Sequence, residues 1–374
     1  MSTVEIREVA TKKEFRLFCN FPIQLYKDHP YAVPDLRMDE RNNLRRDRNP
    51  AFDYCEAKYF LAYRDGKVVG RIAGLINHAA NEKWNTHTLR FCRVDFIDDE
   101  EVSKALFDAV EGWAKERGYD KVIGPIGFCD LDKEGMLVEG FDELDLFITI
   151  YNYPYYMKHL EKLGYAKEED WIEYRIKVPQ TIDPRLARLH QRVLERLNLH
   201  VAEIRNKREV KQYLTGVFDI INEAYDDLYG TVPLTHKQID WYVGQFLPLI
   251  NLKLLSLVLD ENKRIVGLGL AAPSLSEPLR KHKGRLFPFG WISVLRACRK
   301  MDTMNLFFIA VRKEYINKGL PAVMMSHMNQ GAIDLGVQYA ETGPELETNH
   351  KVLSLWKSFD ARQHRRRRCY AKQL

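Results

Sequence analysis

The chain has 374 residues, of which 45% are hydrophobic and 29% are charged, and its formal net charge is +5 at pH 7. These values place it among ordinary globular proteins of a length that allows two domains, and so small a net charge does not demand a nucleic acid as partner. Six scattered cysteines without a Cys-x-x-Cys pair, and the lack of any run of about 20 apolar residues, exclude a cysteine zinc motif and a membrane-spanning helix.

In chain order, the first half predicts a strand over Thr3–Ala10, a helix over Lys12–Tyr26 and an irregular, Arg- and Pro-rich segment over Phe21–Asn49. A hairpin follows over Tyr59–His78, because Asp65-Gly66 is a strong turn pair. The remaining predicted elements are a strand over Leu89–Ile97, a helix over Glu101–Arg117 ended by Gly118, a strand over Lys121–Gly124, an irregular segment over Phe128–Asp145, a helix over Asn152–Leu163 and a closing strand over Asp170–Val178.

The second half begins after Pro179, so we expect one domain over residues 1–178 and another over 179–374. It repeats the order of hairpin, strand, helix, strand, helix and last strand. Its predicted elements are helices over Pro184–Leu197, Arg208–Tyr225 and His236–Phe246, a strand near His200–Arg205, a hairpin over Leu254–Pro273, an insertion over Ser274–Met304, a strand over Leu306–Val311, a helix over Asn317–Leu335, a strand over Gln338–Glu341, a helix opened by Asn349, a basic turn over His364–Arg368 and a last strand near Arg367–Lys372.

The two halves carry matching marks. Gly70 in the first hairpin corresponds to Gly267 in the second, and Asn152 corresponds to Asn349; the offset is 197 residues in both pairs (267 − 70 and 349 − 152). A repeat this long indicates two related domains rather than a solenoid. Strands alternating with helices, together with antiparallel hairpins, predict an α/β fold with a mixed sheet in each domain.

The order of elements resembles the GNAT acyltransferase fold in tandem, and within it the branch of bacterial ceramide synthase-like proteins. The resemblance rests on FPIQLYKDHPYAVPDL at 21–36, DGKVVGRIAG at 65–74, Gly124-Pro125 with GMLVEGFD at 135–142, YNYPYY at 151–156, and Glu341 eight residues before Asn349. It implies acyl-CoA as donor and an amine as acceptor, with a long-chain acyl group and a sphingoid amine as the branch's substrates.

In this fold the pyrophosphate of coenzyme A binds at the start of the helix after the fourth strand, where free amides and the helix dipole attract anions. The first half has four carboxylates there, residues 98–101, which predicts a degenerate cofactor site. The second half offers a basic, glycine-bearing loop at 311–325. The cofactor residues that we expect are Val311, Arg312, Lys313, Asn317, Lys318, Gly319, Leu320 and, toward the pantetheine chain, Asn349.

Two residues depart from the phosphate-loop pattern of the family. Ile316 replaces a polar residue, and Pro321 replaces a small residue and removes an amide donor. The alternative interpretation is an ordinary amphipathic helix with a glycine near its start.

The candidate catalytic residues are Glu341, Glu347 and Tyr339. Glu341 matches the family's acid near the end of the fifth strand and is expected to help deprotonate the amine; its alternative is a carboxylate paired with the Arg365–Arg368 run. Glu347 lies just before a helix and is also suited to capping. Trp356 stands where the family has a tyrosine as general acid, so the usual acid is missing. Tyr339 and Tyr370 are candidates to replace it, and the alternative for each is an ordinary core or edge-strand tyrosine.

The insertion over 278–300 carries seven Lys or Arg, no acid and several aromatic residues. This pattern is typical of peripheral contact with an anionic membrane or of the mouth of an acyl channel, and the alternative is a surface insertion that covers the core. We therefore expect a cytoplasmic N-acyltransferase, associated with the membrane surface, that uses acyl-CoA, an amine acceptor of lipid character, no metal and no nucleic acid. An acetyl- or aminoacyl-specific transferase and a non-catalytic acyl-CoA or lipid-binding protein remain as alternatives.

Overall fold

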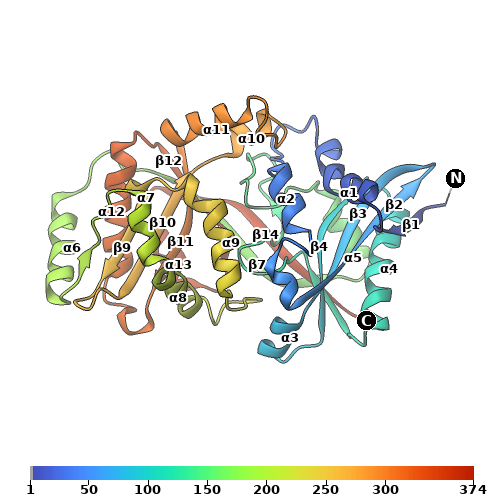
Figure 1. Ribbon diagram of the computed structural model, residues 1–374, viewed down its shortest axis with the longest axis horizontal. Helices are drawn as coiled ribbons and strands as arrows, with labels where there is room; N and C mark the ends of the chain where they lie inside the picture. The colour runs from blue at the N-terminus through green and yellow to red at the C-terminus, as the bar shows by residue number, and fades with distance from the viewer. Residues whose placement is uncertain (1–2) are drawn as a thin grey trace. The chain divides into compact units, whose positions relative to one another are not determined.

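The computed structural model describes residues 3–374, and the chain divides into two compact units (Figure 1). The first unit contains the chain up to Ile172 together with Ser276–Trp291 and Arg365–Leu374, and the second contains Glu173–Leu275 and Ile292–His364. Each unit combines a sheet with covering helices. The predicted mixed α/β class is therefore confirmed.

The first unit is built around the sheet order β1-β2-β3-β4-β5-β14. Its elements are β1 (Glu5–Glu8), α1 (Lys12–Leu25), α2 (Arg37–Asn43), η1 (Pro50–Asp53), β2 (Cys55–Arg64), β3 (Lys67–Asn77), α3 (His78–Trp84), β4 (Thr88–Phe96), α4 (Glu100–Glu116), β5 (Lys121–Gly124), β6 (Met136–Glu139), α5 (Tyr155–Lys162), α10 (Ser276–Lys281) and the end of β14 (Ala361–Gln373). The apolar face of α4, with Val102, Leu106 and Trp113, packs on β3 and β4 and forms the core of the unit.

The second unit has the sheet order β7-β12-β11-β10-β9-β8. Its elements are the end of β7 (Ala166–Lys177), α6 (Pro184–Arg196), β8 (His200–Val201), α7 (Lys207–Val210), η2 (Lys211–Tyr213), α8 (Leu214–Ala224), α9 (His236–Phe246), η3 (Leu247–Leu249), η4 (Leu252–Leu254), β9 (Leu255–Leu259), β10 (Ile265–Pro273), most of α11 (Gly290–Arg299), β11 (Thr303–Val311), η5 (Lys313–Tyr315), α12 (Leu320–Asp334), β12 (Tyr339–Thr342), β13 (Glu345–Leu346) and α13 (His350–Trp356). Leu320 and Met324 of α12 pack on β9 and β10.

Gly70 and Gly267, the two matching glycines of the hairpins, have the same packing role in their own units. A Cβ atom on Gly70 of β3 would lie 2.7 Å from Leu106 of α4, and one on Gly267 of β10 would lie 2.9 Å from Met324 of α12. Both contacts are closer than a side chain allows, so each glycine lets a helix approach its sheet. The repeat seen in the sequence therefore corresponds to the same helix-on-sheet contact in both units.

Each sheet is completed by a strand from the other half of the sequence. In the first unit, the last strand is the C-terminal β14, whose Tyr370–Gln373 pair antiparallel with β5. In the second unit, the closing strand is β7, whose Arg175–Lys177 pair antiparallel with β12. Residues 1–178 taken alone would therefore lack a strand of the first sheet.

Among the α-helices and strands of the first half, three short ones were not predicted from the sequence. α2 and β6 lie in the segments expected to be irregular, and α3 follows the first hairpin directly. α2 and α3 have seven residues each and β6 has four. Elements this short carry too few apolar positions to establish a period.

The helix expected to open at Asn152 begins three residues later, after Pro154. The amide of Asn152 is fully used by β6, because its Oδ1 accepts the Leu137 N–H at 2.7 Å and its Nδ2 donates to the Leu137 carbonyl at 3.0 Å. The side chain acts as a strand partner rather than as a helix cap.

The basic turn expected over His364–Arg368 is also wrong, because these residues lie inside β14. Arg367 is fully buried and donates to Asp145 at 2.7 Å, while Arg366 and Arg368 both bind the buried Asp170. Buried carboxylates neutralise the arginines, which is why so basic a run is tolerated within a sheet.

Candidate functional site

The site in the second unit begins where two parallel strands separate. β11 pairs with β12 only from Thr303 to Leu306, and β11 then continues to Val311 with β10 alone beside it. Beyond Leu306, this edge of β11 therefore has no paired strand among residues 3–374, and it lies next to the loop that leads to α12. The arrangement offers backbone donors and acceptors to an extended ligand.

The loop between β11 and α12 contains two residues with left-handed backbone, Asn317 at φ 66° and Gly319 at φ 89°. These angles interrupt the helix that the sequence predicted from Asn317, so α12 begins at Leu320. Pro321 occupies the first turn, where proline is tolerated because the missing N–H has no intrahelical acceptor. The departure from the family pattern thus removes one amide without disturbing the helix.

The starts of α12 and α4 differ in how their amides are satisfied. No side chain caps α12, and the first-turn amides of Leu320 and Ala322 have no acceptor within the helix. At the start of α4, the carboxylate of Asp99 accepts the N–H groups of Glu101 and Val102. Free amides and a positive dipole end attract an anion, whereas a capping carboxylate repels one.

More charges at α4 reinforce this contrast. Arg64 binds both Asp99 and Glu101, Lys162 binds Glu100, and Nε2 of His159 lies 2.9 Å from Asp98. All four carboxylates that the sequence singled out are therefore engaged by residues of the first unit itself.

The open edge of β4 is also occupied in the first unit. β4 separates from β5 after Arg90, as β11 does from β12. Here, however, the Phe96 N–H donates to the Tyr156 hydroxyl at 2.8 Å, and Tyr155 donates to the Phe96 carbonyl. Tyr155 and Tyr156 of α5 thus occupy the backbone N–H and carbonyl of Phe96, which an extended ligand would otherwise bind at this edge.

The basic residues of the second loop are placed differently from one another. Arg312 is buried, and its guanidinium donates to the Ile265 carbonyl at 2.7 Å and to Glu223. Lys313 is exposed and lies 3.3 Å from Asp227, while the Lys318 ammonium lies 4.9 Å from the centre of the Tyr315 ring. Arg312 fixes the loop from inside, and the exposed cations of the loop are Lys313 and Lys318.

Glu341 lies in β12 with only 6% of its surface exposed. Its Oε1 accepts a hydrogen bond of 2.7 Å from Arg175 of β7, and the Arg175 guanidinium stacks 4.5 Å from the centre of the Tyr339 ring. Arg175 is therefore one ion-pair partner of Glu341. Glu341, Arg175 and Tyr339 form one cluster on the β7–β12 side of the sheet.

Glu345 was not singled out from the sequence. Its carboxylate accepts the Trp356 Nε1–H at 2.7 Å. Burial, opposed by the Trp356 hydrogen bond and assisted by the nearby Glu173 carboxylate, raises the pKa of Glu345 to about 8. A carboxyl that keeps its proton at neutral pH has the state that a general acid needs, and it contacts the tryptophan at the position where the family has its acid. Glu345 is recognised as a possible proton donor only from its burial, because the spacing of the sequence motifs does not indicate it.

The other predicted residues have structural contacts of their own. Asn349 is the N-cap of α13, and its side chain accepts the Val352 N–H. Glu347 is partly buried just before that helix, and 38% of Tyr339 is exposed.

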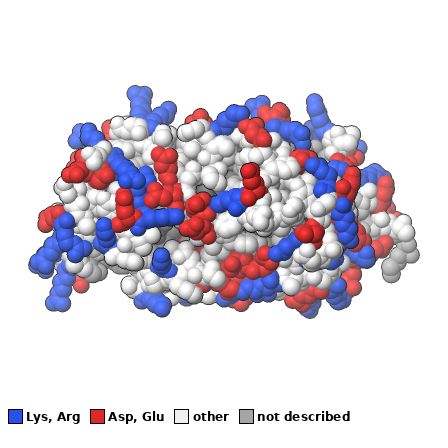
Figure 2. All heavy atoms as spheres, turned by 90° about the horizontal axis from the view of Figure 1, so that it is seen from below, with Lys and Arg blue, Asp and Glu red and all other residues white. Residues whose placement is uncertain are grey.

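Within residues 3–374, no three His, Cys, Asp or Glu side chains lie close enough to hold a metal ion together. No helix of the described chain has both the length and the apolar character needed to cross a bilayer. On the face drawn in Figure 2, cationic and acidic side chains are interspersed rather than gathered into one stripe.

Comparison with known proteins agrees with the fold. No protein-family model matches the chain. Two curated relatives align along almost its whole length: Protein YghO of Escherichia coli at 28% identity, over 99% of this chain and 95% of that protein, and Bacterial ceramide synthase of Caulobacter vibrioides at 26%, over 98% and 96%.

Among solved structures, a tandem GNAT protein from the clavulanic acid biosynthesis pathway matches with a TM-score of 0.58 at 11% identity, covering 99% of this chain and 98% of that one. A GCN5-related N-acetyltransferase from Sphaerobacter thermophilus matches with a TM-score of 0.53 at 11% identity, covering 99% and 95%. The chain therefore has the tandem GNAT fold and is similar along its whole length to a bacterial ceramide synthase.

Proposed function

We propose that the protein transfers an acyl group from acyl-CoA to a primary amine, with the donor bound by the second unit. The observation that carries this proposal is the contrast between the uncapped start of α12 and the start of α4, which is closed by Asp99. The donor's pyrophosphate would take the first-turn amides of α12, with Lys313 and Lys318 nearby. The open edge of β11 beyond Leu306 would accept its pantetheine chain.

In the proposed reaction, the neutral amine nitrogen attacks the thioester carbon, a C–N bond forms, and the C–S bond breaks to release the thiolate. The proton lost by the amine goes to a base, for which we propose Glu341, held in place by Arg175. A thiol with a pKa near ~8.5 leaves tolerably as the anion. A protonated Glu345 supplies a proton donor in the same unit.

We further propose a long-chain donor and a lipid-like amine. The support is the similarity to a bacterial ceramide synthase over the whole chain. Each methylene group buried in an apolar groove contributes about 0.8 kcal/mol, so affinity should rise with acyl length and level off when the groove is full.

The test is a mass-spectrometric assay of amine acylation with donors from acetyl-CoA to a sixteen-carbon acyl-CoA, across a panel of amines. Turnover that increases with acyl length supports the long-chain proposal. If acetyl-CoA is used as well as the sixteen-carbon donor, the protein is a general acetyltransferase instead. If the donor binds but no product forms, it is a binding protein.

We also propose that residues 278–300 bring the protein to an anionic membrane. Phe287, Phe289 and Trp291 are 78%, 67% and 44% exposed, in a segment that has seven cationic residues and no acid. Exposed aromatics with surrounding cations suit the interface of an anionic bilayer.

Replacing Phe289 and Trp291 together with serine should reduce binding to vesicles that contain phosphatidylserine, while acetyl transfer stays unchanged. Trp84→Ser is the matched control, because Trp84 has similar exposure (37%) outside the segment. Equal vesicle binding by the double variant and the wild type would exclude this surface.

A further inference from the structure

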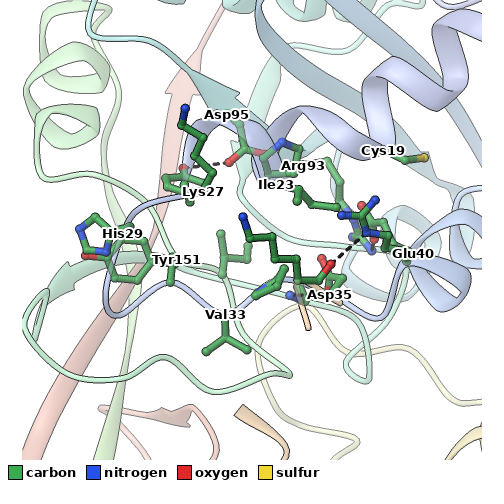
Figure 3. A pocket seen from close by; sticks show the side chains of 18 of the residues that line it. Cys19, Ile23, Lys27, His29, Val33, Asp35, Glu40, Arg93, Asp95 and Tyr151 are labelled. Carbon is green, nitrogen blue, oxygen red and sulfur yellow. Dashed lines mark hydrogen bonds and ion pairs between the residues drawn. The ribbon is translucent and has the colours of Figure 1, made fainter. Parts of the chain in front are cut away.

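A pocket lies within the first unit, between α1, the segment that joins α1 to α2, and strands β3 and β4 (Figure 3). Its enclosed space is about 100 Å³, and the figure rises to about 910 Å³ when the open mouth and the solvent in it are counted. Glu40, Arg71, Arg93 and Asp95 line it, and each is 5% exposed or less. The proposed donor site does not use these residues.

The buried charges of this pocket form a chain of ion pairs. Asp95 accepts from Arg71 Nε at 2.7 Å, Glu40 lies 3.4 Å from both Arg71 and Arg93, and Arg93 binds Asp132 through two bonds of 2.7 Å. Two guanidinium groups thus face three carboxylates, which leaves one buried negative charge in excess. Burying an uncompensated charge is costly, so the site is suited to a cation.

The cations that could satisfy this charge have other partners or lie toward solvent. Lys133 pairs with Asp35 at 2.6 Å, and Arg280 pairs with Glu277 at 2.9 Å. Lys27 and Lys283 line the pocket but are exposed. The negative excess is therefore at the buried end, and the exposed positive charge is at the solvent side.

Asp95 and Arg93 each retain bonding capacity. Asp95 accepts the Tyr26 hydroxyl at 2.9 Å on one oxygen and Arg71 on the other, and an ionised carboxylate has about four acceptor sites. The Nε–H of Arg93 is buried and has no acceptor among residues 3–374. A buried donor without an acceptor points to a ligand oxygen.

We propose that this pocket binds an amine of its own, apart from the transfer site: its ammonium group against Asp95, and an oxygen on the neighbouring carbon at Arg93 Nε. The ligand class is an amino alcohol or amino ketone. β4 is bulged at Arg93, which has φ 47°, and both Arg93 and Asp95 line the pocket, so one small head group can reach both.

The experiment is calorimetry on the full chain without acyl-CoA, below the micelle concentration, with three twelve-carbon probes: 2-amino-1-dodecanol, dodecylamine and 1-dodecanol. The amino alcohol should bind most tightly, the amine less, and the alcohol least. Asp95→Asn should weaken binding of the amino alcohol at least tenfold. Asp35→Asn, which changes another carboxylate of the same pocket, should change it less than threefold.

Ile23→Trp fills the pocket while every charged group of the cluster stays, so it should abolish binding even if Asp95→Asn fails to fold. Equal affinity for all three probes, equal losses at Asp35 and Asp95, or full binding by Ile23→Trp would each overturn the inference. Since no donor is present, loss of acyl transfer alone leaves these measurements unaffected, and the two proposals fail separately.

Discussion

The substitution Gly319→Asp places a carboxylate at the residue that precedes α12. Gly319 has φ 89°, and a Cβ atom there would meet only Val193, at 3.6 Å, so the new side chain has room. The positive φ costs a non-glycine residue about 1–2 kcal/mol of folding stability, with Asp and Asn tolerating it best. Asn has the same shape as Asp but no charge. If Gly319→Asp weakens acyl-CoA binding more than Gly319→Asn does, the difference must therefore come from the charge.

The size of the charge effect follows from Coulomb's law. Two like unit charges about 4 Å apart repel by about 1 kcal/mol in water and by about 4 kcal/mol at the effective dielectric of a protein surface. The carboxylate also takes the amides that a phosphate needs, as Asp99 does at α4. We therefore expect a loss of at least tenfold in acyl-CoA affinity, or about 1.4 kcal/mol.

The assay is isothermal calorimetry of coenzyme A with the full chain, because β14 completes the first sheet and residues 1–178 are not a complete unit. Gly319→Asn is the matched control, with the same shape and backbone strain but no charge, and should lose no more than about threefold. Equal losses for Asp and Asn would refute the electrostatic reasoning, and unchanged binding by both would exclude the loop.

Four further outcomes test the account. Glu341→Gln should lower turnover by about 100- to 10,000-fold while coenzyme A binding persists, and a near-normal rate across pH 6–9 would show that this carboxylate is structural. Asp99→Ala should cost about 0.5–2 kcal/mol in urea unfolding through loss of the cap, with acyl-CoA affinity unchanged. For Glu345, the folded pKa of about 8 exceeds the usual 4.5, so between these values the unfolded state binds fewer protons and stability falls as pH rises; the urea midpoint of Glu345→Gln should show less of this decline from pH 5 to 8. Phe289→Ser with Trp291→Ser should weaken vesicle binding in a flotation assay, as described above.

Periodicity and turn chemistry predicted most of the fold. The Asp65-Gly66 turn has the positive φ angles, 50° and 71°, that its sequence indicated, and the helices at α4 and α9 lie where their apolar spacing placed them. The exchange of β7 and β14 could not be read from the sequence. A strand's own residues specify that it pairs, but not which of two similar sheets it joins.

The site was predicted in part. The glycine and basic residues after β11 were found from position and charge, because they follow a strand directly. Whether Arg312 faces a ligand or the interior depends on Glu223 and Ile265, which are far away in the sequence. The same holds for Glu345, whose raised pKa comes from burial, and for the Asp95–Arg71–Glu40–Arg93–Asp132 cluster, which combines residues of four separate segments.

The central claim is that the donor's pyrophosphate binds the start of α12 and not the start of α4. A crystal structure of the full chain with a long-chain acyl-CoA tests it most directly. The account predicts pyrophosphate density at the amides of Leu320 and Ala322, with Asp99 still capping α4. Pyrophosphate density at α4, or at neither helix, would contradict it.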